Sequence, residues 1–337
     1  MSQIYSFIAS HLRPFVFVLL GWSMLLIPAH AQIDQTKVDD FIRQTAYQQK
    51  RPLVEVETIV NQATFKSDII DKMNRPAEKT MTWERYRNIF MKPERIDAGV
   101  DFWTKNEMVL NQISVQTGVS VEAIIGIIGV ETYFGERMGN YLVLDALYTL
   151  AFGYPRRSSF FKAELSKFFE LCAKEGLDPL AIKGSYAGAM GYGQFMPSSY
   201  LAYAKSYDSD TGADLMNEVN DGIASVANYL KVHRWDQGGL IAIQANKSEN
   251  AEALSKQSVK PNKTISYYTQ KGYKLTESID PNTLASLQTM EMEDGSKEYW
   301  FTFKNFYVIT RYNHSPLYAL AVFQLGEAIK EARKVKQ

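Results

Sequence analysis

The segment GVETYFG at residues 129–135 places one ionisable side chain, Glu131, at the end of a strongly apolar stretch. The i, i+3, i+4 and i+7 positions of one helix face are occupied there by Ile124, Ile127, Ile128 and Glu131. Burial disfavours the charged form of a carboxyl group and raises its pKa, so that part of the population stays protonated at neutral pH. A carboxyl group in this position is a candidate acid catalyst, although it could also pair with Arg137 or lie in water at the rim of the stripe.

Three further segments combine glycine, aromatic and polar residues: YPRR at 154–157, GSYAGAMGYGQFMPSSY at 184–200 and TRYNHSPLYA at 310–319. In the middle segment, four glycines permit tight turns and a close approach of the backbone to a ligand. Ser185, Tyr192 and Gln194 supply neutral hydrogen-bonding groups between them. Uncharged donors and acceptors beside aromatic rings suit a sugar better than a phosphate, but the segment could also be a turn that packs helices.

The elements that must position these segments are mostly helical. Apolar periodicity predicts helices within 34–90 and over 102–115, 121–132 and 160–173, with Ser120 as the N-cap of the helix at 121–132. After about Gln244 the sequence becomes polar and then alternates, and Asp294–Gly295 between two alternating runs predicts a β-hairpin. Because the C-terminal segment LYALAVFQLGEAIKEARK is again helical, a small α+β unit is inserted among helices.

The overall composition argues against nucleic acid as a partner. The 337 residues contain 37 Lys and Arg against 37 Asp and Glu, whereas nucleic-acid binding calls for a basic excess or stripe. The single cysteine, Cys172, cannot form an internal disulfide and is expected to be packed inside the fold.

The N-terminus predicts export. Arg13 precedes a 15-residue apolar run from Pro14 to Pro28, and Ala29 and Ala31 then form a small-x-small pattern, which is typical of a secretory signal peptide. An uncleaved anchor is the alternative, but the run is shorter than the ~20 residues of a spanning helix. No cysteine lies near the cleavage point, so no lipid anchor is expected. We therefore expect a soluble periplasmic protein.

Taken together, these segments resemble the membrane-bound lytic murein transglycosylase B family. The resemblance runs from about Tyr86 to Tyr318 and includes GVETYFGERMG, LDALYTLAF, YPRR, KGSYAGAMGYGQFMPSSY, SVANYLK and ITRYN, in that order. It implies a mainly α (α+β) fold with a lysozyme-like catalytic core, a flanking helical domain and a small inserted β-containing domain. The expected divisions are a signal peptide at 1–31, a helical domain at 32–105 completed by 316–337, a core at 106–255 completed by 306–315, and an α+β insertion at 256–305.

The resemblance also implies roles for single residues. Glu131 would be the acid/base that cleaves the β-1,4 bond between N-acetylmuramic acid and N-acetylglucosamine in peptidoglycan glycan strands, leaving a 1,6-anhydro sugar. Ser185 and Gln194 match residues that hold the substrate's N-acetyl groups. Further matches in or near the cleft are Tyr86, Arg156, Arg157, Tyr192, Phe195, Tyr229, Tyr312, Asn313 and Tyr318. For each aromatic side chain, packing in the core is the competing account.

A single carboxyl group is unusual for a glycosidase, which ordinarily uses two. The nearest candidates, Glu136 and Asp145, are expected to make structural pairs instead. A lone acid suffices if the substrate supplies its own acetamido group and its own hydroxyl as nucleophile. Two alternatives stay open: a muramidase that admits water, and a non-catalytic glycan-binding scaffold.

The resemblance raises calcium as a cofactor, because some family members carry a calcium loop resembling an EF-hand. Here that stretch reads YDSDTGADLMNEVND, in which Asp208, Asp210 and Asp214 could be ligands. Gly212 and Val219 occupy positions that should supply a chelating oxygen. Asp221 could be a ligand or an N-cap. The sequence therefore favours no cofactor, and it leaves the protein partners open.

Overall fold

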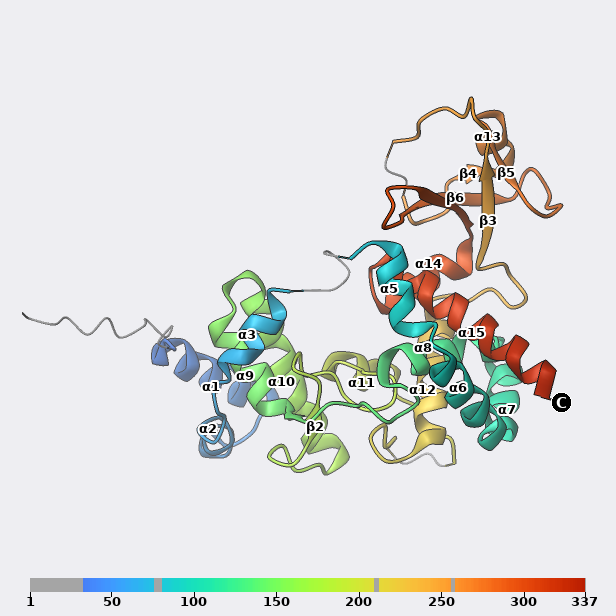
Figure 1. The fold of residues 1–337 in the computed structure, drawn as a ribbon. Helices are drawn as coiled ribbons and strands as arrows, with labels where there is room; N and C mark the ends of the chain where they lie inside the picture. Colours follow the sequence, from blue (N-terminus) through green and yellow to red (C-terminus); the bar gives the residue numbers. More distant parts are fainter. Residues whose placement is uncertain (1–32, 76–80, 209–211, 256–257, 337) are drawn as a thin grey trace, which may run out of the picture. The chain divides into compact units, whose positions relative to one another are not determined.

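The computed structural model describes residues 33–75, 81–208, 212–255 and 258–336 (Figure 1). Residues 34–337 form a single unit of the structure. The predicted signal peptide at 1–31 lies outside the described residues. Helices dominate the described chain, as the sequence predicts, and the strands fall in two small sheets.

The helices before residue 106 belong to two groups. Helix α1 (Gln35–Gln49) packs with α2 (Leu53–Val60) and α10 (Ser158–Glu175), and α3 (Ser67–Met73) packs with α9 (Val143–Gly153). Helices α5 (Trp83–Phe90) and α6 (Pro93–Lys105) pack instead with the C-terminal helix α15 (Pro316–Lys336). The expected helical domain at 32–105 is therefore divided, and only its second part is completed by α15.

Helix α8 (Val121–Thr132) carries Glu131 and is buried on nearly every side. Its isoleucines at 124, 125, 127 and 128 are fully buried, and the Ser120 side chain caps the first turn by accepting from the N–H of Ala123. Helix α15 packs across α8 so closely that a Cβ atom added at Gly126 would lie 2.3 Å from the carbonyl oxygen of Val322. The predicted apolar stripe is confirmed, and the buried surface extends around the whole helix.

One predicted helix is interrupted. The stretch at 102–115 crosses the end of α6 and the start of α7 (Glu107–Thr117), with Asn106 between them at φ −112° and ψ 19°. The Asn106 side chain donates to the carbonyl of Phe102, so it satisfies the end of α6 and the chain turns there. The remaining helices are the 3-10 turn η1 (Pro155–Arg157), α11 (Pro197–Tyr203), α12 (Val219–Val232), α13 (Ile265–Gln270) and α14 (Lys304–Tyr312).

The larger sheet has five antiparallel strands in the order β4-β6-β7-β3-β5 (Figure 1). They are β3 (Ala242–Lys247), β4 (Lys263–Thr264), β5 (Tyr273–Leu275), β6 (Leu284–Glu291) and β7 (Lys297–Thr302). The predicted hairpin is confirmed, since β6 and β7 pair on either side of Asp294–Gly295. Strand β3 lies before the expected boundary at residue 256 and pairs with both β5 and β7. A second sheet pairs β1 (Tyr141–Leu142) with β2 (Lys183–Gly184).

No single helix in the described ranges is long and apolar enough to cross a membrane. By length and composition alone, the pair α7 and α8 meets that requirement, with a bend of 117° between them.

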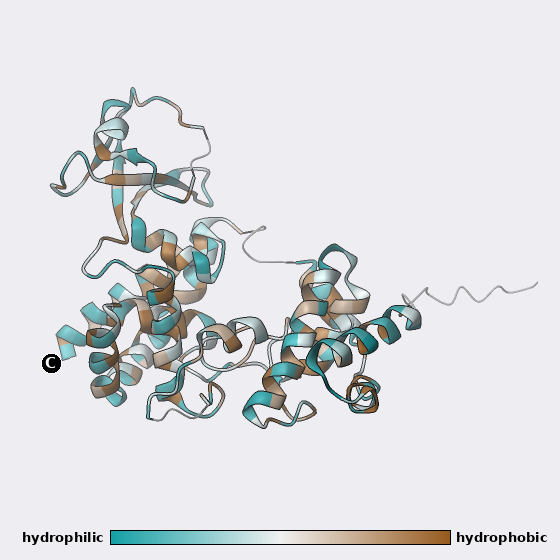
Figure 2. Ribbon diagram, turned by 180° about the vertical axis from the view of Figure 1, so that it is seen from behind, coloured by the Kyte–Doolittle hydropathy of each residue, from teal (hydrophilic) through white to brown (hydrophobic). Residues whose placement is uncertain are grey.

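Helix α15 is the longer neighbour of α8, and its last turns next to the labelled C-terminus are hydrophilic (Figure 2).

We expect Gly126→Ala to lower the free energy of unfolding by about 1–3 kcal/mol, because the new methyl group would overlap the backbone of α15. Helix propensity alone would raise the free energy of unfolding by about 1 kcal/mol, so the sign of the measured change shows whether the close contact or the propensity dominates. Urea denaturation measures it. The control Val115→Ala, at a side chain that is 82% exposed on α7, should stay within about 0.5 kcal/mol of wild type. A stabilised Gly126→Ala would contradict the close contact of α8 and α15.

Candidate active site

Glu131 lies in the last turn of α8 with its side chain half-buried. Its Oε1 atom accepts a hydrogen bond of 2.6 Å from the hydroxyl group of Tyr318, which is 2% exposed in the first turn of α15. A short hydrogen bond from a buried phenol holds the carboxyl group in one orientation. The candidate acid is thus placed by two helices that are distant in sequence.

The phenols beside Glu131 are held in their neutral form. Burial raises the pKa of Tyr318 well above its usual value, and the negative charge of Glu131 raises it further. Burial and Glu131 act in the same way on the pKa of Tyr312. Both hydroxyl groups therefore remain protonated hydrogen-bond donors at neutral pH.

An aromatic cluster supports Tyr312. Its ring centroid lies 5.7 Å from that of Phe195 and 4.7 Å from that of Tyr229, which belongs to α12. The Tyr312 hydroxyl donates to the carbonyl of Gly193 and the Tyr229 hydroxyl donates to the carbonyl of Arg311, each at 2.5 Å. Burial also raises the pKa of Tyr229, to about 12. Phe195 and Tyr229 are buried, so packing accounts for these two residues.

Tyr86 is packed in a similar way. It lies in α5, is 3% exposed, and its ring centroid is 5.2 Å from that of Phe90. It also contributes to the raised pKa of Tyr318, so it lies near the Glu131 site.

The glycine-rich segment forms a braced loop between β2 and α11. The Ser185 Oγ atom accepts from the N–H groups of Ala187 and Ala189 at 3.3 and 3.0 Å. Gln194 has a left-handed φ of 50° and donates through Nε2 to the carbonyls of Met138 and Gly191 at 3.0 and 3.1 Å. Both side chains are half-buried, so they shape the loop and also border solvent.

Thr132 joins this loop to α8, and sequence reasoning missed it. Its Oγ1 atom lies 2.9 Å from the carbonyl oxygen of Tyr192 and accepts from the N–H of Gly135 at 3.0 Å. The half-buried Tyr192 is therefore tied to the residue next to Glu131. The sequence offers one signal, because Thr132 follows Glu131 at the end of an apolar helix, where a buried threonine needs a hydrogen-bond partner. The partner itself, 60 residues away, is seen only in the structure.

Arg156 and Arg157 lie on the 3-10 turn η1, before α10. Both are exposed on η1, and the Arg157 guanidinium group lies 4.2 Å from the ring centroid of Phe160 at the start of α10. Asn313 follows α14, and its carbonyl accepts from the N–H of Ser315 at 2.7 Å.

The other carboxyl groups considered from the sequence lie elsewhere. Asp145 is buried and accepts from the N–H of Thr64 at 2.7 Å, so its predicted structural role is confirmed. Glu136 is exposed beyond the end of α8. Cys172 is buried as predicted, and burial raises the pKa of its thiol to about 12.

The candidate calcium loop uses its carboxylates to support its own backbone. Asp221 lies within the first turn of α12, and its two oxygens accept from the N–H groups of Tyr207 and Asp214 at 2.7 and 2.8 Å. Asp221 therefore does not act as the N-cap, as one reading of the sequence had it. Asp214 accepts from the N–H groups of Met216 and Asn217. Asp208 is exposed, and Asp210 lies outside the described residues. The described ranges contain no cluster of three His, Cys, Asp or Glu side chains suited to a metal ion.

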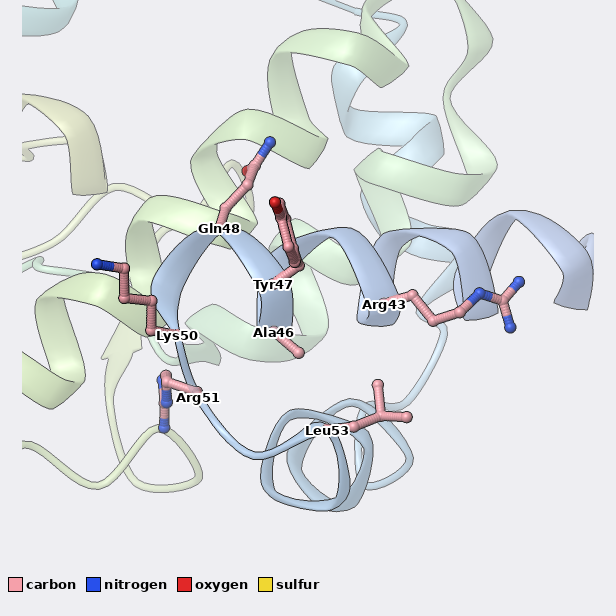
Figure 3. Close-up of a pocket in the computed structure, with 7 residues that line it drawn as sticks. All are labelled: Arg43, Ala46, Tyr47, Gln48, Lys50, Arg51 and Leu53. Atoms are coloured by element: carbon pink, nitrogen blue, oxygen red, sulfur yellow. The ribbon is translucent and has the colours of Figure 1, made fainter.

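A separate depression lies between α1 and α2, lined by residues that include Arg43, Tyr47, Lys50 and Leu53 (Figure 3). The Tyr47 side chain is 87% exposed there. The lining contains no carboxyl group and none of the predicted site residues.

Comparison with known proteins gives the family. The model of the transglycosylase SLT domain matches residues 34–327, which include every site residue described above. This chain belongs to the lytic transglycosylase family. The transglycosylase is 42% identical over 288 residues to the membrane-bound lytic murein transglycosylase B of Escherichia coli K12, covering 83% of this chain and 78% of the relative.

Solved structures agree with this assignment and with the expected lysozyme-like fold. The Escherichia coli lytic transglycosylase Slt35 in complex with bulgecin A is 40% identical, with a TM-score of 0.80 over 88% of this chain and 93% of that one. Slt35 in complex with calcium is 39% identical, with a TM-score of 0.81 over 90% and 95% of the two chains. The fold class predicted from the sequence is therefore confirmed.

Ionisation of the buried tyrosines should destabilise the transglycosylase in alkali. A phenol whose pKa is raised on folding contributes stability below its unfolded pKa of about 10, and this stability is lost as the pH rises. In Tyr318→Phe, the free energy of unfolding should fall less steeply above pH ~10 than in wild type. The two slopes should differ by about 1.4 kcal/mol per pH unit, the contribution of one ionising group. Urea denaturation from pH 9 to 11.5 measures the slope. Tyr47→Phe should leave it unchanged, since that side chain is 87% exposed. Equal slopes for Tyr318→Phe and wild type would contradict the burial of this phenol.

Proposed function

We propose that this chain cleaves the β-1,4 bond between N-acetylmuramic acid and N-acetylglucosamine in peptidoglycan, with Glu131 as the single acid/base. The observation that carries the proposal is the hydrogen bond of 2.6 Å from the buried Tyr318 to the half-buried Glu131, within a protein of the lytic transglycosylase family. The relative from Escherichia coli is named for action on murein, which supports the same substrate here.

In the proposed mechanism, the Glu131 carboxyl group first donates its proton to the glycosidic oxygen. The bond between that oxygen and the anomeric carbon of the muramoyl residue breaks, and the substrate's acetamido group stabilises the positive charge. The muramoyl 6-hydroxyl then attacks the anomeric carbon and gives its proton to the Glu131 carboxylate. The carboxyl group returns to its starting state, and the product carries a 1,6-anhydro ring.

The surroundings of Glu131 suit both halves of this cycle. Tyr318 holds one carboxyl oxygen in place and, as a neutral phenol, adds no charge to the site. The carboxyl group of Asp145 accepts a hydrogen bond from the N–H of Thr64, and the side chain of Glu136 is exposed. Neither is therefore proposed as the second carboxyl group of a two-carboxyl mechanism. The half-buried Ser185, Tyr192 and Gln194 are the proposed contacts for the N-acetyl groups and the sugar ring.

Mass analysis of digested peptidoglycan tests the proposal against its alternatives. Products ending in 1,6-anhydromuramic acid are expected. Reducing muramic ends would show a muramidase that uses water, and the absence of cleavage would show a non-catalytic scaffold.

The variant Glu131→Gln should fold normally and lose cleavage by roughly 10²-fold or more, because an amide of the same shape cannot donate a proton. Product release from purified peptidoglycan measures activity, and circular dichroism checks the fold. A matched control is Glu136→Gln, which makes the same exchange at an exposed site five residues later and should keep full activity. Substantial turnover by Glu131→Gln would remove this residue from its proposed role.

Calcium is proposed to contribute little to stability. Asp221 and Asp214 already accept backbone N–H groups, and Gly212 and Val219 offer no side-chain oxygen. Although the related Slt35 has a calcium complex, this donor set does not fit a tight site. Specific binding at a calcium concentration of 100 Kd would add about 2.7 kcal/mol. Thermal melts with millimolar calcium and with chelator should therefore coincide. A rise of several degrees that magnesium does not reproduce would contradict this proposal.

The protein is further proposed to be exported to the periplasm as a soluble enzyme. The short apolar run before Ala31 and the absence of a nearby cysteine support cleavage without lipid attachment. N-terminal sequencing of the protein isolated from its source cells should begin near Gln32. Recovery of the intact N-terminus in membranes would contradict export by cleavage.

A further inference from the structure

The turn that follows Glu131 has an unusual backbone. Three residues in succession have left-handed φ angles, which are 53° at Tyr133, 61° at Phe134 and 98° at Gly135. This region is unfavourable for residues with a Cβ atom, so two of them in a row persist only where the surroundings hold them. The turn begins two residues after Glu131, and any relaxation of it would move the end of α8.

The Phe134 ring provides part of the restraint. It lies 5.5 Å from the ring centroid of Phe102 in α6. It also lies against Gly129 of α8, where an added Cβ atom would come within 2.8 Å of the ring. The Phe134 N–H donates back to the carbonyl of Ile128 at 3.3 Å. Phe134 is thus wedged between α6 and the last turn of α8.

Arg95 provides the rest of the restraint from α6. It is 7% exposed, and its Nη1 atom donates to the carbonyl of Gly129 at 2.7 Å. Its guanidinium group lies 4.6 Å from the ring centroid of Tyr133 and 5.2 Å from that of Phe90. A guanidinium group on a carbonyl of the last helical turn complements the negative end of the helix dipole. One side chain therefore contacts both the last turn of α8 and the first strained residue after it.

The same turn also reaches the rest of the site. Thr132, between Glu131 and Tyr133, contacts the carbonyl of Tyr192, and its own carbonyl accepts from the N–H of Arg137 at 2.8 Å. On the other side of Arg95, Phe90 packs on Tyr86. A shift of the turn would therefore change the position of Glu131 and of the loop together.

We propose that Arg95 is a positioning residue, which acts through Gly129 and Tyr133 to keep Glu131 in line with Tyr318 and the substrate. The inference rests on the proposed role of Glu131 as acid/base. It predicts an effect on the rate of the chemical step, because small displacements of a catalytic group reduce rate more than substrate binding.

The test uses Arg95→Met, which removes the donor and the charge, and Arg95→Lys, which keeps the charge and one donor. We expect kcat to fall about tenfold or more in Arg95→Met while KM changes by less than about twofold. Arg95→Lys should recover part of the loss. Hydrogen exchange of a peptide covering 125–140 should be faster in Arg95→Met, and this readout does not require activity.

Arg333→Met is the matched control. The Arg333 guanidinium group also stacks on an aromatic ring, 5.0 Å from that of Trp103, and pairs with Glu107 at 2.6 Å. Both arginines have a buried Nε atom without a hydrogen-bond partner. Arg333→Met should lower the melting temperature but leave kcat and exchange over 125–140 unchanged when assayed well below that temperature.

Two results would overturn the proposal. One is an Arg95→Met enzyme whose kcat matches that of Arg333→Met, and the other is a change confined to KM. If Arg95→Met does not fold, Arg95→Lys decides by the same two measurements. Retained activity in Glu131→Gln would instead count against the proposed function, and the exchange data would still report on the restraint by Arg95.

Discussion

The close packing of α8 against α15 is the constraint on which the site depends, because it brings Tyr318 to Glu131 across 187 positions of sequence. Glycines make the approach possible on both helices. A Cβ atom at Gly126 would lie 2.3 Å from the Val322 carbonyl oxygen, and one at Gly326 would lie 2.3 Å from that of Glu122. Since packed interiors resist small displacements, the hydrogen-bond geometry is set by a helix–helix contact and not by a loop.

The polar groups around Glu131 are mostly neutral and fixed to the backbone. Tyr312 and Tyr229 donate to main-chain carbonyls, and Gln194 does the same from the glycine-rich loop. These hydrogen bonds fix the side chains that surround Glu131. They also satisfy the hydroxyl groups of the tyrosines that lie near this half-buried carboxyl group. In the proposed mechanism, a frame of oriented neutral dipoles can accept the change of charge on Glu131 during proton transfer without rearranging, which is the form of electrostatic support that lowers barriers most.

Features determined by neighbouring residues could be predicted from the sequence. The Ser120 cap, the apolar stripe before Glu131 and the hairpin at Asp294–Gly295 are local, and the structure confirms all three. The Asn106 break is local too, but periodicity hides it because apolar residues continue on both sides and only the side-chain hydrogen bond to Phe102 shows why the chain turns.

Features that depend on distant residues could not be predicted from pattern alone. Strand β3 looks like a helix-to-loop transition until its pairing with β5 and β7 is known. The partners of Asp145 are the backbone N–H of Thr64 and the side chain of Lys66 at 3.7 Å, both about 80 residues away, and only the fold brings them together. The family resemblance indicates Tyr318 as a site residue, but its hydrogen bond to Glu131 is seen only in the fold. Arg95 lies outside every recognisable motif, since its role comes from a carbonyl and a ring on another element.

The five-stranded sheet is connected to the site through α5. The Glu298 Oε2 atom on β7 accepts from the indole N–H groups of both Trp83 and Trp300, at 3.1 and 3.0 Å. Trp83 is fully buried at the start of α5, three residues before Tyr86. A carboxylate oxygen that accepts from two indole N–H groups fixes both the distance and the relative orientation of the two rings, because each donor is rigid. The sheet therefore holds the first turn of α5 through Trp83, and in this way it limits where Tyr86 can lie beside Tyr318.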